Sequence, residues 1–180
     1  GNLILAGAIY NKTCSFDNSS KWYSLSAPWF GSKAARWIQR ICGNASYWQE
    51  PIRLIAKKMT FCADGDEKKV NDAYNSLRRD NPKLPLILPM TERVDGATCG
   101  DSAFGITSLY SPGFELLAAE IGYGQWNDGI VGLSSCVLPG RKYGEDPSAD
   151  NYMVQVNHVD TMCRNGDGYG LGRKPCQWLP

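Results

Sequence analysis

Asn127-Asp128-Gly129-Ile130-Val131 and Asn157-His158-Val159-Asp160 are the two segments that decide how this sequence is interpreted. The second contains the only histidine of the chain. It follows Tyr152–Val156, whose composition predicts a short strand, so we expect His158 near the end of a strand. Asp128 lies upstream in a glycine-flanked turn. An imidazole acting as general base and a carboxylate that orients it can together activate a serine. The alternative is an ordinary surface or core histidine.

These segments carry a resemblance to a known family. The stretch from Asn127-Asp128-Gly129 through Ser134-Ser135-Cys136 to Asn157-His158-Val159-Asp160 resembles the C-terminal part of secreted triacylglycerol lipases of the α/β-hydrolase superfamily. In the bacterial members, an Asn-Asp-Gly-Leu-Val segment carries the catalytic aspartate and an Asn-His-Leu-Asp segment carries the catalytic histidine. The resemblance implies Asp128 as the triad acid and His158 as the base. It covers the last third of the chain well and the middle poorly. The implied fold class is α/β, as the C-terminal part of an α/β-hydrolase sheet.

The first residues of the chain resemble a second part of this family. In a Gly-x-Ser-x-Gly nucleophile elbow, the last glycine opens a buried helix of small and apolar residues. Gly1–Ile9 has this character, so we expect Gly1 to be that glycine and the nucleophile serine to lie two residues before Gly1. Trp22–Pro28 reads as a strand that ends in a proline-bearing turn, as in the lipases. The alternative is that residues 3–9 form an ordinary buried strand.

Ser102 offers an alternative nucleophile within the chain. Gly100-Asp101-Ser102 precedes Asp128 and His158, so the order serine, acid, histidine is present. Phe104 occupies the position two residues after Ser102, where a strained elbow needs glycine. We therefore favour the upstream serine and keep Ser102 as the alternative.

The cysteines and glycosylation signals indicate an oxidising compartment. The seven cysteines are widely spaced without a Cys-x-x-Cys pair, which favours disulfides over a zinc site. The odd cysteine either pairs with an upstream partner or is a free buried thiol. Three N-glycosylation acceptors, at Asn11, Asn18 and Asn44, agree with secretion. We expect a secreted, extracellular protein.

The middle of the chain predicts a helical insertion. Ser32 can cap a helix over residues 33–42 that Gly43 ends, and further helices are expected after Pro51 and up to Asn81-Pro82. We expect one partial domain over 1–180, with core segments 1–30 and 93–180 and a helical cap over 31–92. Leu84–Met90 is expected to face the core or a sheet edge. The aromatic residues that either line such a lid or belong to the core are Trp29, Phe30, Trp37, Tyr47 and Trp48.

The expected ligands follow from the same patterns. The resemblance implies an ester substrate, small or lipid, with peripheral contact to a lipid surface and with the missing N-terminal half of the domain. The net charge of +1 gives no reason to expect nucleic acid. We expect no organic cofactor, because the glycine-rich residues 166–172 lack the strand and helix of a dinucleotide site. Asp160 matches a calcium ligand of the bacterial relatives, but a single carboxylate makes no calcium site, and a helix cap is the favoured role.

The sequence thus predicts an ester hydrolase that uses a serine, a histidine and an aspartate, with the chain alone inactive. Two alternatives stay open: a self-contained hydrolase that uses Ser102, and a secreted, disulfide-linked binding module without catalytic activity.

Overall fold

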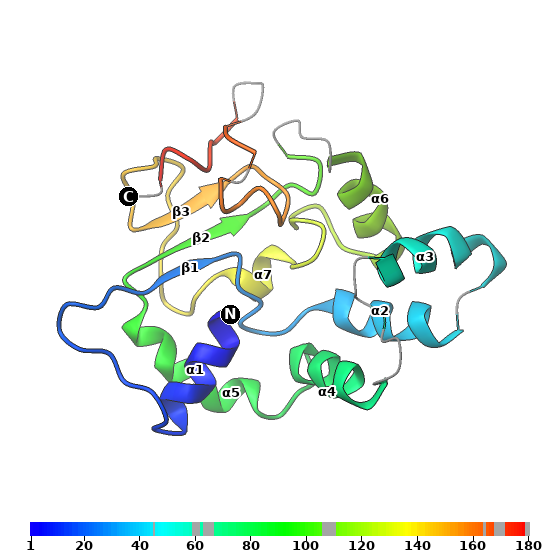
Figure 1. Ribbon diagram of the computed structural model, residues 1–180. Coiled ribbons are helices and arrows are strands. Elements are labelled where there is room, and N and C mark those ends of the chain that lie inside the picture. The colour runs from blue at the N-terminus through cyan, green and yellow to red at the C-terminus, as the bar shows by residue number, and fades with distance from the viewer. Residues whose placement is uncertain are drawn as a thin grey trace.

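Three short parallel strands form the sheet of this mixed α/β protein, which we describe from a computed structural model (Figure 1). The strands are β1 (Tyr23–Leu25), β2 (Gly96–Gly100) and β3 (Asn151–Val154). They lie in the order β1-β2-β3, and both neighbouring pairs are parallel. All carboxyl ends of the strands therefore meet at one edge of the sheet, where ligand sites of parallel sheets usually form.

The structure describes residues 1–44, 46–58, 62, 67–105, 111–163, 165–167 and 172–178. Part of the glycine-rich stretch 166–172 lies outside these ranges. None of the described helices is both long enough and apolar enough to span a bilayer. The helices, of which η1 and η2 are 3-10 helices, are α1 (Asn2–Tyr10), α2 (Lys33–Asn44), η1 (Tyr47–Gln49), α3 (Glu50–Lys58), α4 (Glu67–Leu77), α5 (Leu84–Ile87), η2 (Leu88–Arg93), α6 (Ser111–Ile121) and α7 (Leu133–Cys136).

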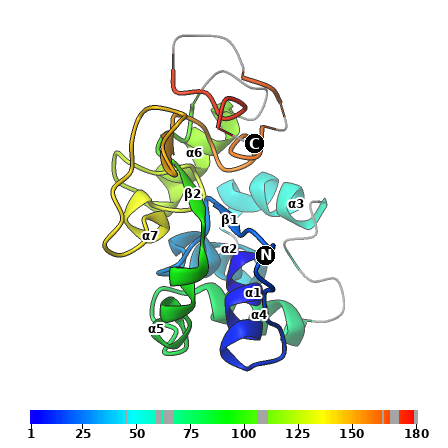
Figure 2. The ribbon, with the colours of Figure 1, turned by 90° about the vertical axis from the view of Figure 1, so that its left-hand side faces the viewer.

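The two faces of the sheet are covered differently. Side chains alternate along β2, so that Ala97 and Cys99 point to one face and Thr98 to the other. The first face packs against α1, α5, η2 and α7, and its core includes Ala6, Trp22 and Trp29. The other face is covered by the C-terminal segment, where Trp178 packs with Tyr152, Val154, Val156 and Leu25. In Figure 2, α1 and α5 lie below β2, and the C-terminal segment lies in the upper part of the view.

The two edges of the sheet also differ. On the β3 edge, Gly144 bonds to both Asn151 and Met153, and the N–H of Gln155 donates to the carbonyl of Arg173. On the β1 side, the carbonyl of Trp22 accepts the N–H of Asp95, and the N–H of Ser26 donates to the carbonyl of Thr98. Because backbone groups alternate in direction along a strand, Tyr23 and Leu25 direct their N–H and C=O groups away from β2. Neither of these two residues has another backbone partner in the described part of the chain. Within the described ranges the β1 edge is therefore open, whereas backbone groups pair along the β3 edge.

The region between β1 and β2 is helical, as the sequence predicts. Ser32 caps α2, since its hydroxyl accepts the N–H of Ala34 at 3.0 Å. Gly43 was expected to end this helix, but α2 continues to Asn44. The two ends of the segment 32–77 lie side by side, because the N–H of Ser32 donates to the carbonyl of Leu77 at 2.7 Å. At Gly31, a Cβ atom would lie 2.6 Å from the backbone nitrogen of Arg79, so this contact requires glycine.

The segment Leu84–Met90 is part of the core and not a sheet edge. It forms α5 and the start of η2, each with a proline in its first turn. Ile87, Leu88 and Met90 pack against the core cluster that contains Ala6 and Ala97. The core-facing alternative is therefore confirmed.

Six of the seven cysteines are paired. The disulfides are Cys42–Cys62, Cys99–Cys136 and Cys163–Cys176, which fits an oxidising, extracellular environment. Cys14 is free and exposed, so the alternative of a buried free thiol is wrong.

Candidate active site

The loop between α6 and α7 holds Asp128 in a fixed turn. The Oδ1 atom of Asp128 accepts the N–H groups of Ile130 at 3.0 Å and Val131 at 2.6 Å. Asn127 accepts the N–H of Gly129 in the same way. Gly129 has φ +92°, and a Cβ atom there would lie 2.6 Å from the ring of Phe114, so both the turn and its packing need glycine. This turn uses one carboxylate oxygen of Asp128 and leaves the other available.

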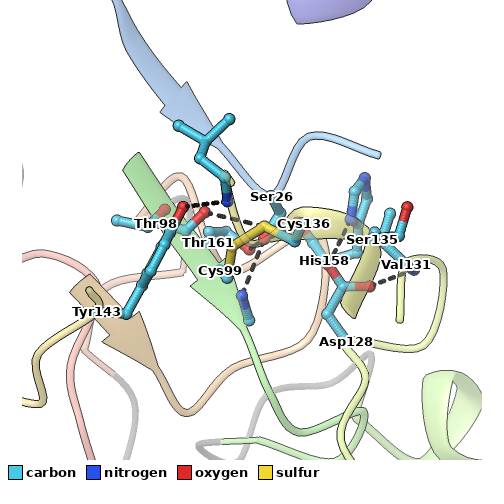
Figure 3. The surroundings of a disulfide bond; sticks show 12 residues. Ser26, Thr98, Cys99, Asp128, Val131, Ser135, Cys136, Tyr143, His158 and Thr161 are labelled. Atoms are coloured by element: carbon cyan, nitrogen blue, oxygen red, sulfur yellow. Dashed lines mark hydrogen bonds and ion pairs between the residues drawn. A yellow bond between two sulfur atoms is a disulfide. The ribbon is translucent and has the colours of Figure 1, made fainter. Parts of the chain in front are cut away.

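His158 lies four residues after β3 and meets this carboxylate. Its Nδ1 is 2.7 Å from Oδ2 of Asp128, and its backbone N–H donates to the carbonyl of Asp128 at 2.8 Å (Figure 3). A carboxylate only accepts hydrogen bonds, so Nδ1 carries the proton of the neutral ring and Nε2 bears the lone pair. Asp128 is buried, with 1% of its side chain exposed, whereas 33% of the His158 side chain is exposed. Nε2 has no hydrogen-bond partner among the described residues. The structure thus brings the two sequence-predicted residues together in the geometry of a general base.

The charge of Asp128 determines the protonation of His158. Burial lowers the pKa of His158, but the negative charge of Asp128 and its hydrogen bond raise it by more, so the pKa lies above the usual 6.5. A base must be neutral, so catalysis by His158 would increase as the pH rises through this pKa. The linkage to stability has the opposite sign. The contribution of the ion pair is complete below pH 6.5 and is lost as the pH rises through the raised pKa.

An NMR titration of the imidazole proton signals tests this pair directly, because the chain contains a single histidine. We expect a pKa of His158 above 6.5 in the wild-type chain and a lower one in Asp128→Asn, where burial acts without the opposing charge. Asp146→Asn, an exposed loop change, is the matched control and is expected to leave the titration unchanged. Equal pKa values in the wild-type and Asp128→Asn chains would show that the 2.7 Å contact is not formed in solution.

Ser26 links the strand ends behind the pair and was missed by the sequence analysis. It follows β1 with φ +43°, and its hydroxyl accepts the N–H of Gly100 at 3.1 Å. The same hydroxyl is 3.0 Å from the hydroxyl of Thr161, which in turn donates to the carbonyls of Asn157 and His158. These bonds fix the loop after β3 to the end of β1. The Ser-Ala-Pro turn after β1 was the one signal in the sequence for this position.

Gly100 lies directly behind Asp128. A Cβ atom at this position would be 2.6 Å from the carbonyl oxygen of Val156 and 2.8 Å from the Cβ of Asp128. We therefore expect Gly100→Ala to lower the free energy of unfolding by about 1–3 kcal/mol, because the added methyl group overpacks the site. Gly113→Ala in α6 is the control, since a methyl group there meets nothing within 4 Å. It is expected to stabilise by at most about 1 kcal/mol. Urea denaturation measures the free energy of unfolding of both variants. An unchanged value for Gly100→Ala would contradict this packing.

A disulfide connects β2 to the helix that follows the Asp128 loop. Cys99 and Cys136 are fully buried, and the bond closes a segment of the chain that contains Asp128 (Figure 3). Ser32 and Tyr123 both donate hydrogen bonds to the carbonyl of Ile130. The acid-bearing loop is thus held on both sides.

Ser102 precedes Asp128 and His158 in the sequence, but its hydroxyl is used in a local turn. Its hydroxyl accepts the N–H of Gly105 at 2.9 Å, and its backbone bridges to Asn127. In the described part of the chain, no hydrogen bond joins Ser102 to His158.

Asp160 is buried, and asparagine side chains use both of its oxygens. Oδ2 accepts the amide of Asn157 at 2.7 Å, and Oδ1 accepts that of Asn165. Residues 158–163 form turns, so the expected role of Asp160 as a helix cap is wrong. No group of three or more histidine, cysteine or acidic side chains suited to a metal lies within the described ranges.

One surface groove lies beside the Asp128 loop and not at His158. It has a volume of about 680 Å³, and its lining includes Tyr123–Trp126, Gly132–Ser135 and Val137–Arg141. It contains neither Asp128 nor His158.

The expected lid aromatics divide between core and surface. Trp29 and Trp37 are core residues, whereas Tyr47 and Trp48 are 99% and 79% exposed.

Comparisons with protein-family models, curated proteins and solved structures found no match to this chain.

Proposed function

We propose that the protein hydrolyses carboxylic esters with a serine nucleophile that His158 activates and Asp128 supports. The observation that carries the proposal is the 2.7 Å contact of a buried carboxylate with Nδ1 of a histidine. The opposite ring nitrogen of His158 is left free. This is the arrangement that a serine hydrolase needs in its base.

The proposed reaction uses both ring nitrogens of His158. The serine hydroxyl attacks the ester carbonyl while Nε2 takes its proton, and the imidazolium that forms is stabilised by Asp128. His158 then delivers the proton to the leaving alcohol, and water releases the acyl group by the same steps. Backbone N–H groups beside the nucleophile would stabilise the oxyanion.

The open edge of the sheet and the start of α1 support a nucleophile upstream of Gly1. A strand that paired in parallel with β1 would end at the same edge as β1 and continue directly into α1. In Figure 1, α1 begins near the carboxyl end of β1. Strand, sharp turn and helix in this order make up a nucleophile elbow. We therefore propose that the serine lies two residues before Gly1, at the same edge of the sheet as His158, where the carboxyl ends of the strands meet.

The proposed substrate class is a lipid-like ester. Tyr47, Trp48 and Leu54 on η1 and α3 are exposed apolar side chains. Aromatic residues of this kind favour the boundary between water and lipid. These side chains support peripheral contact with a lipid surface by the helical segment.

Covalent labelling tests this proposal. The polypeptide is expressed with the residues that its gene encodes before Gly1, treated with a fluorophosphonate probe, and assayed on p-nitrophenyl esters from acetate to palmitate. Variants replace the upstream serine or Ser102 with alanine. We expect the label and the turnover to be lost only with the upstream serine.

Each outcome has a distinct meaning. Loss of the label in Ser102→Ala alone would overturn the upstream assignment and favour the self-contained triad. Absence of both label and turnover in a folded protein would overturn the enzyme proposal and favour a binding module.

A further inference from the structure

The loop that joins α1 to β1 contains two N-glycosylation triplets, Asn11-Lys12-Thr13 and Asn18-Ser19-Ser20. Such a triplet is modified only when its asparagine is accessible. Both asparagines are exposed to solvent. Neither carboxamide has a hydrogen-bond partner in the described part of the chain, so both amide nitrogens are available to an enzyme.

The local backbone presents both asparagines outward. Asn11 ends α1, and the chain then turns back at Lys12, where φ is +58°. Thr13 secures this turn, since its hydroxyl donates to the carbonyl of Ala8 at 3.1 Å. The other asparagine, Asn18, lies in a turn that begins at Asp17. There the carboxylate accepts the N–H groups of Ser19 and Ser20 at 2.9 and 2.8 Å. Carbohydrate at either position extends into solvent without displacing a packed side chain.

The location of the loop separates it from the candidate active site. It leads into the amino end of β1, whereas His158 follows the carboxyl end of β3 (Figure 1). Carbohydrate on this loop would leave His158 accessible. The three disulfides fit the oxidising kind of compartment where such transfer takes place.

We propose that Asn11 and Asn18 carry N-linked oligosaccharides. In the transfer, the amide nitrogen of asparagine forms a bond to the anomeric carbon of a sugar held on a polyprenyl pyrophosphate. The bond from that carbon to the pyrophosphate oxygen breaks, the lipid pyrophosphate leaves with the electron pair, and the amide proton passes to a base of the transferase. The modification is independent of the proposed hydrolase activity.

The experiment uses secretion from a eukaryotic cell that glycosylates its proteins. The third triplet begins at Asn44, whose side chain lies outside the described set, so Asn44→Gln serves as the background. Asn11→Gln and Asn18→Gln are compared with matched controls that keep the triplets, Thr13→Ser and Ser20→Thr. The readouts are gel mobility before and after treatment with peptide N-glycosidase and peptide mass mapping.

We expect the glycosidase to shift the background chain by the mass of two oligosaccharides and each glutamine variant by the mass of one. Each control is expected to shift by the mass of two. Mass mapping is expected to recover Asn11 and Asn18 as aspartate after enzymatic release. Recovery of both residues as unmodified asparagine would overturn the proposal, provided that a second secreted glycoprotein from the same cells is fully modified. Modification of only one of them would overturn it for the other.

Discussion

Asp128→Asn is expected to lower kcat for ester hydrolysis about 10⁴-fold while the protein stays folded. The carbonyl oxygen of the new amide can still accept the N–H groups of Ile130 and Val131, so the turn keeps its shape. The amide NH₂, however, donates to Nδ1 of His158. That bond places the ring proton on Nε2, the nitrogen that has to accept the proton of the serine. The measurement is steady-state turnover of the p-nitrophenyl ester that the labelled protein cleaves fastest.

The controls separate this effect from loss of folding. His158→Ala is expected to lower kcat by a similar factor. The double variant is expected to lower kcat no further than either single variant, because the two side chains act as a unit. Asp146→Asn removes an exposed carboxylate in a turn and is expected to retain full turnover. Turnover of Asp128→Asn within a few-fold of the wild-type value would exclude Asp128 as the residue that orients the base.

Removal of the Cys99–Cys136 disulfide is expected to lower the free energy of unfolding by about 4 kcal/mol, the value that chain entropy gives for a loop of this length. The bond joins residues 37 positions apart, and both sulfurs lie in the core. We expect the double variant Cys99→Ala/Cys136→Ala to show this loss in urea denaturation. Turnover is expected to fall as well, because Asp128 lies within the closed segment.

The Cys163–Cys176 disulfide supplies the matched comparison. It closes a shorter segment, with a separation of 13 residues, and is only partly buried. Its removal is expected to cost about 3 kcal/mol by the same relation, without loss of packing in the core. A larger loss of stability for this pair than for Cys99–Cys136 would contradict the view that the buried bond holds the acid-bearing loop.

The sequence predicted the elements whose signals are local. The Ser32 cap and the helices expected near Pro51 and before Asn81-Pro82 each depend on nearby residues, and α2, α3 and α4 are found there. Asp128 and His158 were selected by motif, and the structure places them in contact.

The features that could not be predicted depend on residues distant in sequence. Asp160 was expected to cap a helix, but Asn157 and Asn165 use its carboxylate in a turn. The role of Ser26 depends on Gly100 and Thr161, which belong to other parts of the chain. Cysteine pairing likewise follows from tertiary contacts and not from spacing. The helical form of Leu84–Met90 had a usable signal, since Pro85 and Pro89 suit the first turn of a helix.

The junction of Gly31 with Arg79 has a consequence for how this protein can diverge. The backbone leaves and re-enters the body of the protein at two adjacent points, and the helical branch between them also packs against Leu117 and Ile121 of α6. A much shorter connection would bridge the same gap, and a longer one would add little closure entropy. We therefore expect length changes in the part of this branch that lies away from α6 to be tolerated, while the strands keep their register.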